Sequence, residues 1–550
     1  MRSLLEGITS TLRLAQKQQS QTLQSRKQGA LTEAEYDATM KNRQDDVALL
    51  EAVEPLSRTA VASRSQSSCR FTTEAPADLP FRMLLITQNI GAIGPEVPKQ
   101  AEGGLPALGD ELSDAVRLQV RDFVSELRMV VYDCSRCEYD TYLRASRAST
   151  EEMMQVISET TGIELVPPLV DVVVIHFQEV GGKRLHKGFN AYFEKALESL
   201  LPEAGWTSGL LMESSNEVGR FTAIGSIVYL SHRMCPISSM LSFRHRTFVC
   251  VTDDPATYGG SPTYLYHAGK FSNAGESRKG YLLISLRLGT VVVNYLNLHL
   301  FNDGAGSDGS PGAPFSCAKL RQEAILEALA ECAAFICTGD PLFIFGDFNT
   351  RLDLGGLLQH LKETRGIEVE VTSNEVRAPE DFWALFEDSQ HSGTIKVYDV
   401  EMQRLMDIVA QQSGVELAEF AVRFPPTYKC LAVVDEKVGI PCMRGTSTLE
   451  GENMCNERQT AFGCDSNAFS IPERIMCASG REFSRERIPA WCDRIVWNPS
   501  SLELMMGRGR RASATGAGSD AAACAEALRR YAYRSFALKH TDHDGVALFF

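Results

Sequence analysis

The 550-residue sequence contains no run of about 18 apolar residues, the length that a membrane-spanning helix requires. No early apolar segment is followed by a small-residue cleavage site, so we expect no secretory signal. The last cysteine is Cys524, so we expect no C-terminal prenylation box. These absences favour a cytoplasmic location, leave a nuclear one open, and allow at most peripheral contact with a membrane.

Basic residues are in deficit, with 55 Lys and Arg against 70 Asp and Glu and a formal net charge of -15. Nucleic-acid backbones are bound mainly by clustered Lys and Arg, so we expect no nucleic acid as substrate. The 15 cysteines are irregularly spaced, and those between Cys430 and Cys477 are separated by nine to thirteen residues. Zinc ligands typically come in closer pairs, so we expect free thiols.

Neither a Walker loop nor a Gly-rich dinucleotide motif is present, which disfavours nucleotide-dependent transfer. From Phe81 onward, short β-type runs alternate with helical patterns, and several runs are continuously apolar, as in strands covered on both faces. This alternation predicts an α/β fold. Strands are predicted over Met83–Ile90, Val172–Phe177, Phe221–Leu230, Arg246–Val251, Tyr281–Leu288, Val291–Leu298, Leu342–Phe345, Asp493–Trp497 and Gly545–Phe550, and a helix over Lys319–Cys337.

The domain organisation is predicted from a change in composition near residue 80. Residues 1–80 are rich in Gln, Ser, Arg and Ala, and we expect a helical, partly flexible extension that could bind a protein partner. Residues 81–550 are predicted to form one large domain, because no long linker separates the strands. Surface insertions are expected near 99–114, 133–165, 302–316, 430–480 and 505–523.

Polar residues stand at the ends of several predicted strands, where ligands of α/β folds gather. The pairs are Thr87 and Asn89, Gln178 and Glu179, Asn297 and His299, and Asp347 and Asn349. A carboxylate and an amide that leave a buried strand together suit the positioning of a water and a phosphate oxygen. A polar turn that merely caps a strand gives the same pattern.

Two further segments carry charged groups next to strands. Asp493 and Arg494 open an apolar strand, where they could form a buried salt bridge, or Asp493 could orient a catalytic histidine. His543 lies between Asp542 and Asp544, and flanking carboxylates can hold a histidine charged near pH 7, so that it can meet a phosphate. A surface turn is the alternative for this segment.

Two motifs in this chain resemble the signature motifs of the inositol polyphosphate 5-phosphatases. They are Gly346-Asp347-x-Asn349-x-Arg351 and Pro489-Ala490-Trp491-Cys492-Asp493-Arg494, accompanied in the family's order by Thr87-x-Asn89, Gln178-Glu179, Arg278-Lys279-Gly280, Asn297-x-His299 and Asp542-His543. Further stretches most resemble the type I branch, the inositol trisphosphate 5-phosphatases. The resemblance spans roughly residues 81–550 and implies a catalytic domain with the fold of DNase I, a four-layer α/β/β/α sandwich.

The resemblance also implies Mg²⁺-dependent removal of a 5-phosphate from an inositol ring. The implied metal residues are Glu179 and Asp542, and the implied catalytic residues are Asp347, Asn349, His299, His543, Asp493 and Asn89. In these roles Asp347 would position or deprotonate the attacking water, and Asn349 and His299 would contact the scissile phosphate. His543 would stabilise the charge of that phosphate, oriented by Asp493.

The substrate is expected to be the headgroup of an inositol polyphosphate or a phosphoinositide. The candidates are inositol 1,4,5-trisphosphate, inositol 1,3,4,5-tetrakisphosphate, and the phosphatidylinositol 4,5-bisphosphate and 3,4,5-trisphosphate lipids. Lys279 and Arg487 are candidate cations for the ring phosphates. Tyr428 and Lys429 resemble residues with which lipid-hydrolysing members grip the 4-phosphate, whereas Glu486 stands where many of those members have a lysine. A nuclease or sphingomyelinase of the same fold, or an inactive inositide-binding scaffold, stays open as an alternative.

Overall fold

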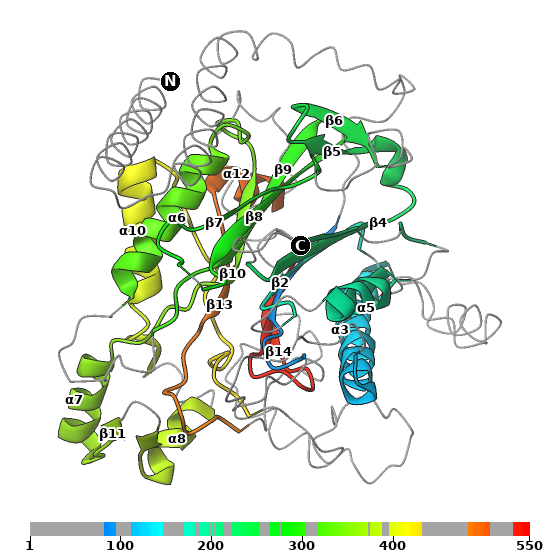
Figure 1. The fold of residues 1–550 in the computed structure, drawn as a ribbon. Helices are drawn as coiled ribbons and strands as arrows, with labels where there is room; N and C mark the ends of the chain where they lie inside the picture. Colours follow the sequence, from blue (N-terminus) through cyan, green and yellow to red (C-terminus); the bar gives the residue numbers. More distant parts are fainter. Residues whose placement is uncertain are drawn as a thin grey trace, which may run out of the picture. The chain divides into compact units, whose positions relative to one another are not determined.

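Two large β-sheets organise the described part of the chain (Figure 1). The computed structural model describes residues 82–94, 112–146, 170–181, 187–198, 200–201, 205–207, 210–213, 222–251, 264–275, 277–303, 317–371, 375–387, 395–431, 482–505 and 532–550. The chain divides into a unit of residues 1–70 with 330–337 and a unit of residues 71–329 with 338–550. Both sheets belong to the second unit. The predicted extension over residues 1–80 lies outside the described residues.

The first sheet has six strands in the order β14-β15-β1-β2-β4-β3. Their bounds are β1 Met83–Asn89, β2 Val172–Gln178, β3 Leu210–Glu213, β4 Ile224–Leu230, β14 Ala532–Phe536 and β15 Gly545–Phe549. The strands β1 and β2 run parallel, and the other neighbours are antiparallel. Every residue of β1 and β2 is buried, which explains their continuous apolar runs.

The second sheet has seven strands in the order β13-β10-β9-β8-β5-β6, with β7 paired to β8. Their bounds are β5 Ser238–Ser242, β6 Thr247–Cys250, β7 His267–Lys270, β8 Gly280–Leu288, β9 Val291–His299, β10 Leu342–Asp347 and β13 Asp493–Trp497. The strands β9 and β10 run parallel, and β8 and β13 are antiparallel to their neighbours. A separate two-stranded ribbon pairs β11 Glu370–Val371 with β12 Val376–Arg377.

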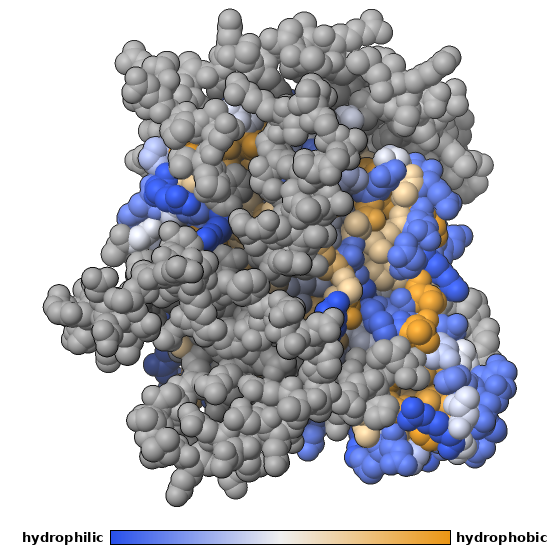
Figure 2. Space-filling model, turned by 180° about the vertical axis from the view of Figure 1, so that it is seen from behind, coloured by the Kyte–Doolittle hydropathy of each residue, from blue (hydrophilic) through white to orange (hydrophobic). Residues whose placement is uncertain are grey.

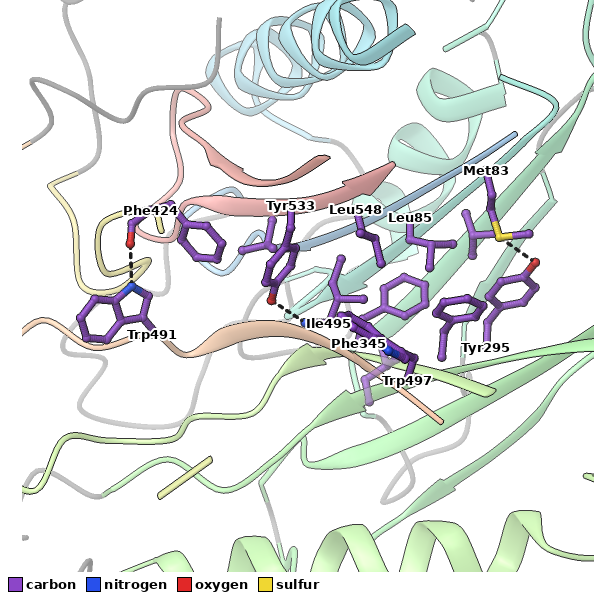
Figure 3. Close-up of a cluster of buried hydrophobic side chains, with 14 of the residues drawn as sticks. Met83, Leu85, Tyr295, Phe345, Phe424, Trp491, Ile495, Trp497, Tyr533 and Leu548 are labelled. Carbon is purple, nitrogen blue, oxygen red and sulfur yellow. Dashed lines mark hydrogen bonds between the residues drawn. The ribbon is translucent and has the colours of Figure 1, made fainter. Parts of the chain in front are cut away.

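The main hydrophobic core fills the space between the two sheets (Figure 3). Leu85 and Leu548 enter it from the first sheet, and Phe345 and Ile495 enter it from the second. Because side chains alternate along a strand, each sheet gives one face to this core and keeps the other for helices. Figure 3 also shows that the backbone N–H of Ile495 donates to the Tyr533 hydroxyl at 3.1 Å, so a polar group within the core is satisfied.

Helices cover the outer faces of the sheets. The helices α3 (Asp114–Ser146) and α5 (Lys187–Glu198) cover the six-stranded sheet, where Phe177 of β2 contacts Phe123 and Phe193. The helix α6 (Ala318–Cys332) lies beside the seven-stranded sheet (Figure 1), and Glu327 accepts a hydrogen bond from the backbone of Ser272, just after β7. The remaining helices are η1 Cys235–Ile237, α7 Leu354–Arg365, α8 Glu380–Glu387, α10 Glu401–Ser413 and α12 Pro499–Met505.

The predicted α/β/β/α sandwich is confirmed by this arrangement. The predicted strands occur with bounds shifted by at most a few residues, but the predicted helix over Lys319–Cys337 ends at Cys332, five residues early. The sequence analysis missed six strands of the described residues, namely β3, β5, β7, β11, β12 and β14, because each is short, with two to five residues. The helix α3 continues to Ser146, into the range 133–165 where an insertion is expected. Most of the other expected insertions lie outside the described residues.

The surface of the described residues mixes hydrophilic and hydrophobic side chains. Figure 2 shows this from behind, with hydrophilic residues predominating at the lower right, where α7 and α8 lie. Among the helices that the structure describes, none is long and apolar enough to cross a bilayer.

Candidate active site

The polar residues predicted at strand ends lie together, at the carboxyl ends of central strands of the two sheets. Asn89 ends β1, and Glu179 directly follows the parallel strand β2. On the second sheet, Asp347 at the end of β10 is in register with His299 at the end of β9. The antiparallel strand β13 begins opposite them, with Asp493 in register with Asp347. The topology therefore gathers residues that are up to 404 positions apart in the sequence, from Asn89 to Asp493.

Asp347 lies at the centre of the site and is buried. Its Oδ2 accepts a hydrogen bond from Nδ2 of Asn89 at 3.0 Å, and its Oδ1 accepts one from the backbone N–H of Asn349 at 2.9 Å. Burial opposes ionisation, but the positive charges of His543 and of Lys279 outweigh it and lower the pKa of Asp347. The carboxylate is therefore ionised at neutral pH and held in one orientation.

A cluster of charged groups surrounds His299 beside Asp347. The Nε2 atom of His299 lies 3.5 Å from Oδ2 of Asp347 and 3.6 Å from Oε1 of Glu179, and it also contacts Nζ of Lys279. Burial and the charge of Lys279 lower the pKa of His299 to about 3, so the ring is neutral. Burial lowers the pKa of Lys279 to about 8, although Asp347 and Glu179 favour its charged form.

Glu179 presents its carboxylate to the same space. Its Oε2 accepts a hydrogen bond from Arg278 at 2.9 Å. Burial opposes ionisation, but the positive charges of Arg278, Lys279 and His543 lower the pKa of Glu179 to about 2. The backbone φ of Glu179 is 63°, a left-handed value that is uncommon for a non-glycine residue and typical of functional sites. A Cβ atom on Gly91 would lie 2.4 Å from Oε2 of Glu179, so only glycine leaves room for this carboxylate.

His543 and Asp493 form a buried pair on the other side of Asp347. The Nδ1 atom of His543 lies 2.9 Å from Oδ2 of Asp493. Burial disfavours the charged imidazole, but Asp493 and Asp347 outweigh it and raise the pKa of His543 to about 9. The backbone N–H of Asp493 in turn donates to the Thr427 hydroxyl at 3.1 Å. His543 is therefore a cation at neutral pH, with its ring oriented by Asp493.

Two hydrogen bonds orient the side chain of Asn349. Its backbone φ is 54°, its Nδ2 donates to the carbonyl of Leu300 at 3.1 Å, and its Oδ1 accepts from the Arg351 guanidinium at 3.0 Å. Because Arg351 can only donate and a carbonyl can only accept, these contacts fix which end of the amide points where. Arg351 also lies over the ring of Tyr428, with Cζ 4.9 Å from the ring centroid.

The residues predicted to bind substrate lie in two places. Tyr428 packs on His543 with ring centroids 4.3 Å apart, whereas Lys279 is buried beside His299. Lys429 forms an ion pair with Glu486 at the surface. Arg487 is half-buried. Burial raises the pKa of Tyr428 to about 12, and the charges of Arg351 and Arg487 counteract this effect.

Two groups of residues could hold a cation. The atoms of Asp347, Asp493 and His543 all lie within 4.8 Å of one another, but a charged imidazole that is bonded to its own carboxylate is a poor ligand. The carboxylate of Glu179 and the amide oxygen of Asn89 are hard oxygen donors that lie 2.4 Å and 3.2 Å from the position that a Cβ atom on Gly91 would take, and they fit a cation such as Mg²⁺ better. The Asp542 carboxylate also acts on His543, helping to raise the pKa of the histidine.

Sequence reasoning gave no role to three residues of the site. Arg278 pairs with Glu179, Arg351 holds Asn349, and Thr427 accepts hydrogen bonds from the backbone N–H groups of Cys492 and Asp493. Arg278 and Arg351 stand within quoted motifs, which was a signal for them. Thr427 acts across 66 residues through its hydroxyl, and local sequence gives no signal of that contact.

These features define an α/β sandwich protein with an enzyme-like site for phosphate chemistry. No family model matches the chain. Inositol polyphosphate-5-phosphatase A of Homo sapiens is 23% identical over 353 residues, covering 61% of this chain and 76% of that protein. A probable type I inositol 1,4,5-trisphosphate 5-phosphatase of Caenorhabditis elegans is 26% identical over 213 residues, covering 36% of this chain and 51% of that one. The resemblance to the inositol polyphosphate 5-phosphatases is confirmed by these similarities.

Solved structures give weaker likenesses. The 5-phosphatase domain of SpSynaptojanin, in complex with inositol (1,4)-bisphosphate and calcium ion, matches with a TM-score of 0.37 and 12% identity over 85% of this chain and 83% of that chain. TDP2 of Caenorhabditis elegans matches with a TM-score of 0.31 and 10% identity over 95% of this chain and 88% of that chain. At these scores, neither structure supports an argument about the site.

Proposed function

We propose that this protein is an inositol polyphosphate 5-phosphatase, which hydrolyses the 5-phosphate of inositol polyphosphates or phosphoinositides with the help of Mg²⁺. The observation that carries the proposal is the convergence of Asp347, His543 and Lys279 at one end of the central strands, where each residue belongs to a different motif that resembles the family. A phosphate monoester carries negative charge, and its hydrolysis needs fixed donors and a group that positions a nucleophilic water. This site offers cationic donors and the fixed carboxylate of Asp347.

Asp347 positions the attacking water. Its carboxylate is ionised and fixed by Asn89 and Asn349, so its free lone pairs can accept a hydrogen bond from a water at a set direction. A low pKa makes Asp347 better suited to orient this water than to retain its proton. Asn349 keeps one N–H of its amide beyond the one donated to Leu300, which can contact a phosphate oxygen.

Two cations face the phosphate from opposite sides of Asp347. His543 is held charged by Asp493 and can donate its Nε2–H to a phosphate oxygen, stabilising the charge that develops there. Lys279 is buried beside His299, so we assign it to the scissile phosphate rather than to a ring phosphate. Burial strengthens both interactions because little water screens them.

Glu179 and Asn89 would hold the Mg²⁺ ion, since they offer the hard oxygen donors of the site. The bound ion supplies a Lewis acid that neutralises charge on the phosphate. Arg278 donates to Oε2 of Glu179 and keeps this carboxylate ionised, ready for a cation. Asp542 stays a further proposed ligand.

The ring phosphates would be bound around Tyr428. Arg487 lies near this tyrosine, and Lys429 follows it in the sequence, so both can reach a substrate that lies over His543. Lys429 is already paired with Glu486, which lowers the attraction that it offers to a second anion. We therefore expect a 4-phosphate to increase substrate affinity less than it would if Lys429 were not paired with Glu486.

The test is phosphate release from the two soluble and two lipid candidates, with Mg²⁺ and with a chelator. We expect release from at least one 5-phosphorylated inositide that depends on Mg²⁺ and is lost in Asp347→Asn. Cleavage of DNA or sphingomyelin without inositide turnover would favour another phosphodiesterase. Inositide binding without turnover would favour a scaffold, and either outcome contradicts the proposal.

We also propose a cytoplasmic location, with the nucleus as the second compartment, and a protein partner for residues 1–80. Fluorescence microscopy of the full chain tests the location. A pull-down that compares the full chain with a chain lacking residues 1–80 tests the partner. The full chain should retain the bound protein, and the shortened chain should lose it.

A further inference from the structure

A buried ion pair joins two outer helices behind the site. Arg321 of α6 is fully buried and is the only charged residue among the largest fully buried side chains of the described residues. Its Nε donates to Oε1 of Glu401 at 2.6 Å and its second terminal nitrogen donates to Oε2 at 3.0 Å. Glu401 is the first residue of α10 and is also buried. The pair is bidentate, the strongest geometry for an arginine and a carboxylate.

The remaining donor atom of Arg321 holds the segment that follows β9. It donates to the carbonyl of Phe301 at 2.8 Å and to the carboxylate of Asp303 at 3.0 Å. This segment begins directly after His299, and it includes Leu300, whose carbonyl accepts the hydrogen bond from the Asn349 amide. Arg321 therefore fixes the backbone that orients one side of Asn349.

Glu401 holds the segment that follows β10. Its Oε2 accepts a hydrogen bond from the backbone N–H of Arg351 at 2.8 Å. The guanidinium of Arg351 donates in turn to Oδ1 of Asn349, whose backbone N–H donates to Asp347. The same ion pair is thus connected by hydrogen bonds to both strand ends that carry the reacting groups.

We propose that Arg321 and Glu401 are positioning residues for this active site: they clamp the segments after β9 and β10 so that Asn349 and Asp347 keep their orientation. The inference rests on the proposed function. A buried ion pair adds little to stability beyond what apolar residues of similar volume would give, so stability alone does not account for it. Each partner bonds to the backbone of a different strand end, which is what positioning requires.

The test is a double variant, Arg321→Met with Glu401→Met, which replaces the pair with apolar side chains of similar length. Both charges of the pair are removed together, and Asp303, which also loses Arg321, is only partly buried and still accepts a hydrogen bond from the backbone N–H of Cys317. We therefore expect the thermal midpoint to stay close to that of the wild type. The clamp predicts that kcat for inositide hydrolysis falls by about 10- to 100-fold with KM almost unchanged. It also predicts faster hydrogen exchange at the backbone amide of Arg351.

Asp171→Asn is the matched control. Asp171 directly precedes β2 and pairs with Arg233, whereas Glu179 directly follows the same strand. The substitution at the far end of β2 should therefore leave kcat unchanged. A double variant with wild-type kcat and wild-type exchange at Arg351 would overturn the clamp. If the double variant does not fold, Arg321→Lys, which keeps the charge but loses the bidentate geometry, decides by the same two measurements. If the wild type hydrolyses no inositide, the proposed function fails while the exchange result still decides on the clamp.

Discussion

Nδ1 of His543 lies 2.9 Å from Oδ2 of Asp493, and both residues are buried. The pair joins residues 50 positions apart, one before β15 of the first sheet and one at the start of β13 of the second. Its consequence is a histidine that is charged at neutral pH, with its Nε2 side directed away from Asp493. Several predictions about the site depend on it.

The first concerns Asp493 itself. Asp493→Asn keeps the size of the side chain but removes the charge that raises the pKa of His543, so less of the cation is present at neutral pH. We expect kcat to fall by about 100-fold or more. Steady-state kinetics on protein with an unchanged circular dichroism spectrum checks this. A variant with wild-type kcat would show that the charge of His543 is not used.

The second concerns the cation. Glu179→Gln keeps one oxygen donor and removes the negative charge, so the Mg²⁺ concentration that gives half-maximal activity should rise about 10-fold or more. A Mg²⁺ titration of activity measures it, with Asp171→Asn as a control at the opposite sheet edge. If the curve of Glu179→Gln coincides with those of the control and the wild type, the ion is bound elsewhere.

The third concerns Lys429 and its partner Glu486. Glu486→Gln removes the acid that competes for Lys429, and we expect kcat/KM for a 4-phosphorylated substrate to rise about twofold to tenfold. Lys429→Ala should weaken 4-phosphorylated substrates more than others. A substrate panel run on both variants measures the effect. Equal changes across the panel would mean that Lys429 does not contact a ring phosphate.

The fourth concerns stability at low pH. His176 is buried between the sheets, stacked on Phe345 with ring centroids 3.6 Å apart, and burial lowers its pKa to about 3. The unfolded chain binds a proton below about pH 6.5, whereas the folded protein does not until about pH 3. The contribution of His176 to the free energy of unfolding is therefore fully present above pH 6.5. As the pH falls from 6.5 to about 3, the protein loses about 1.4 kcal/mol of this stability for each pH unit.

The variant His176→Phe keeps a stacked ring and cannot titrate. Urea unfolding between pH 7 and pH 5 should therefore show a shallower decline for His176→Phe than for the wild type. The same pH dependence for both proteins would mean that His176 also binds a proton in the folded state over this range.

The sequence predicted the strands that form the centre of the sheets, because burial on both faces favours apolar runs such as residues 172–175 in β2. It did not predict the edge strand β14 (Ala532–Phe536), whose apolar and polar residues are mixed in a short run. Such strands are specified mainly by the neighbour with which they pair, here β15.

The site was predicted in the same uneven way. Residues at strand ends, such as Asp347 and His299, could be found because parallel strands bring their carboxyl ends together. Lys279 was assigned to the ring phosphates, and its place beside His299 became evident only from the register of β8 with β9. The contacts of Arg321 with Glu401 join two helices 80 residues apart, and no local pattern specifies them.

The measurement that tests the central claim most directly is phosphate release from inositol 1,4,5-trisphosphate by the wild type and by Asp347→Asn, both with Mg²⁺. The arrangement of Asn89, Asp347 and Asn349 predicts release by the wild type and a loss of about 1,000-fold or more in the variant, whose fold is kept. Equal rates for the two proteins would contradict the assignment of the site. No release by the wild type from this or any other 5-phosphorylated inositide would contradict the function.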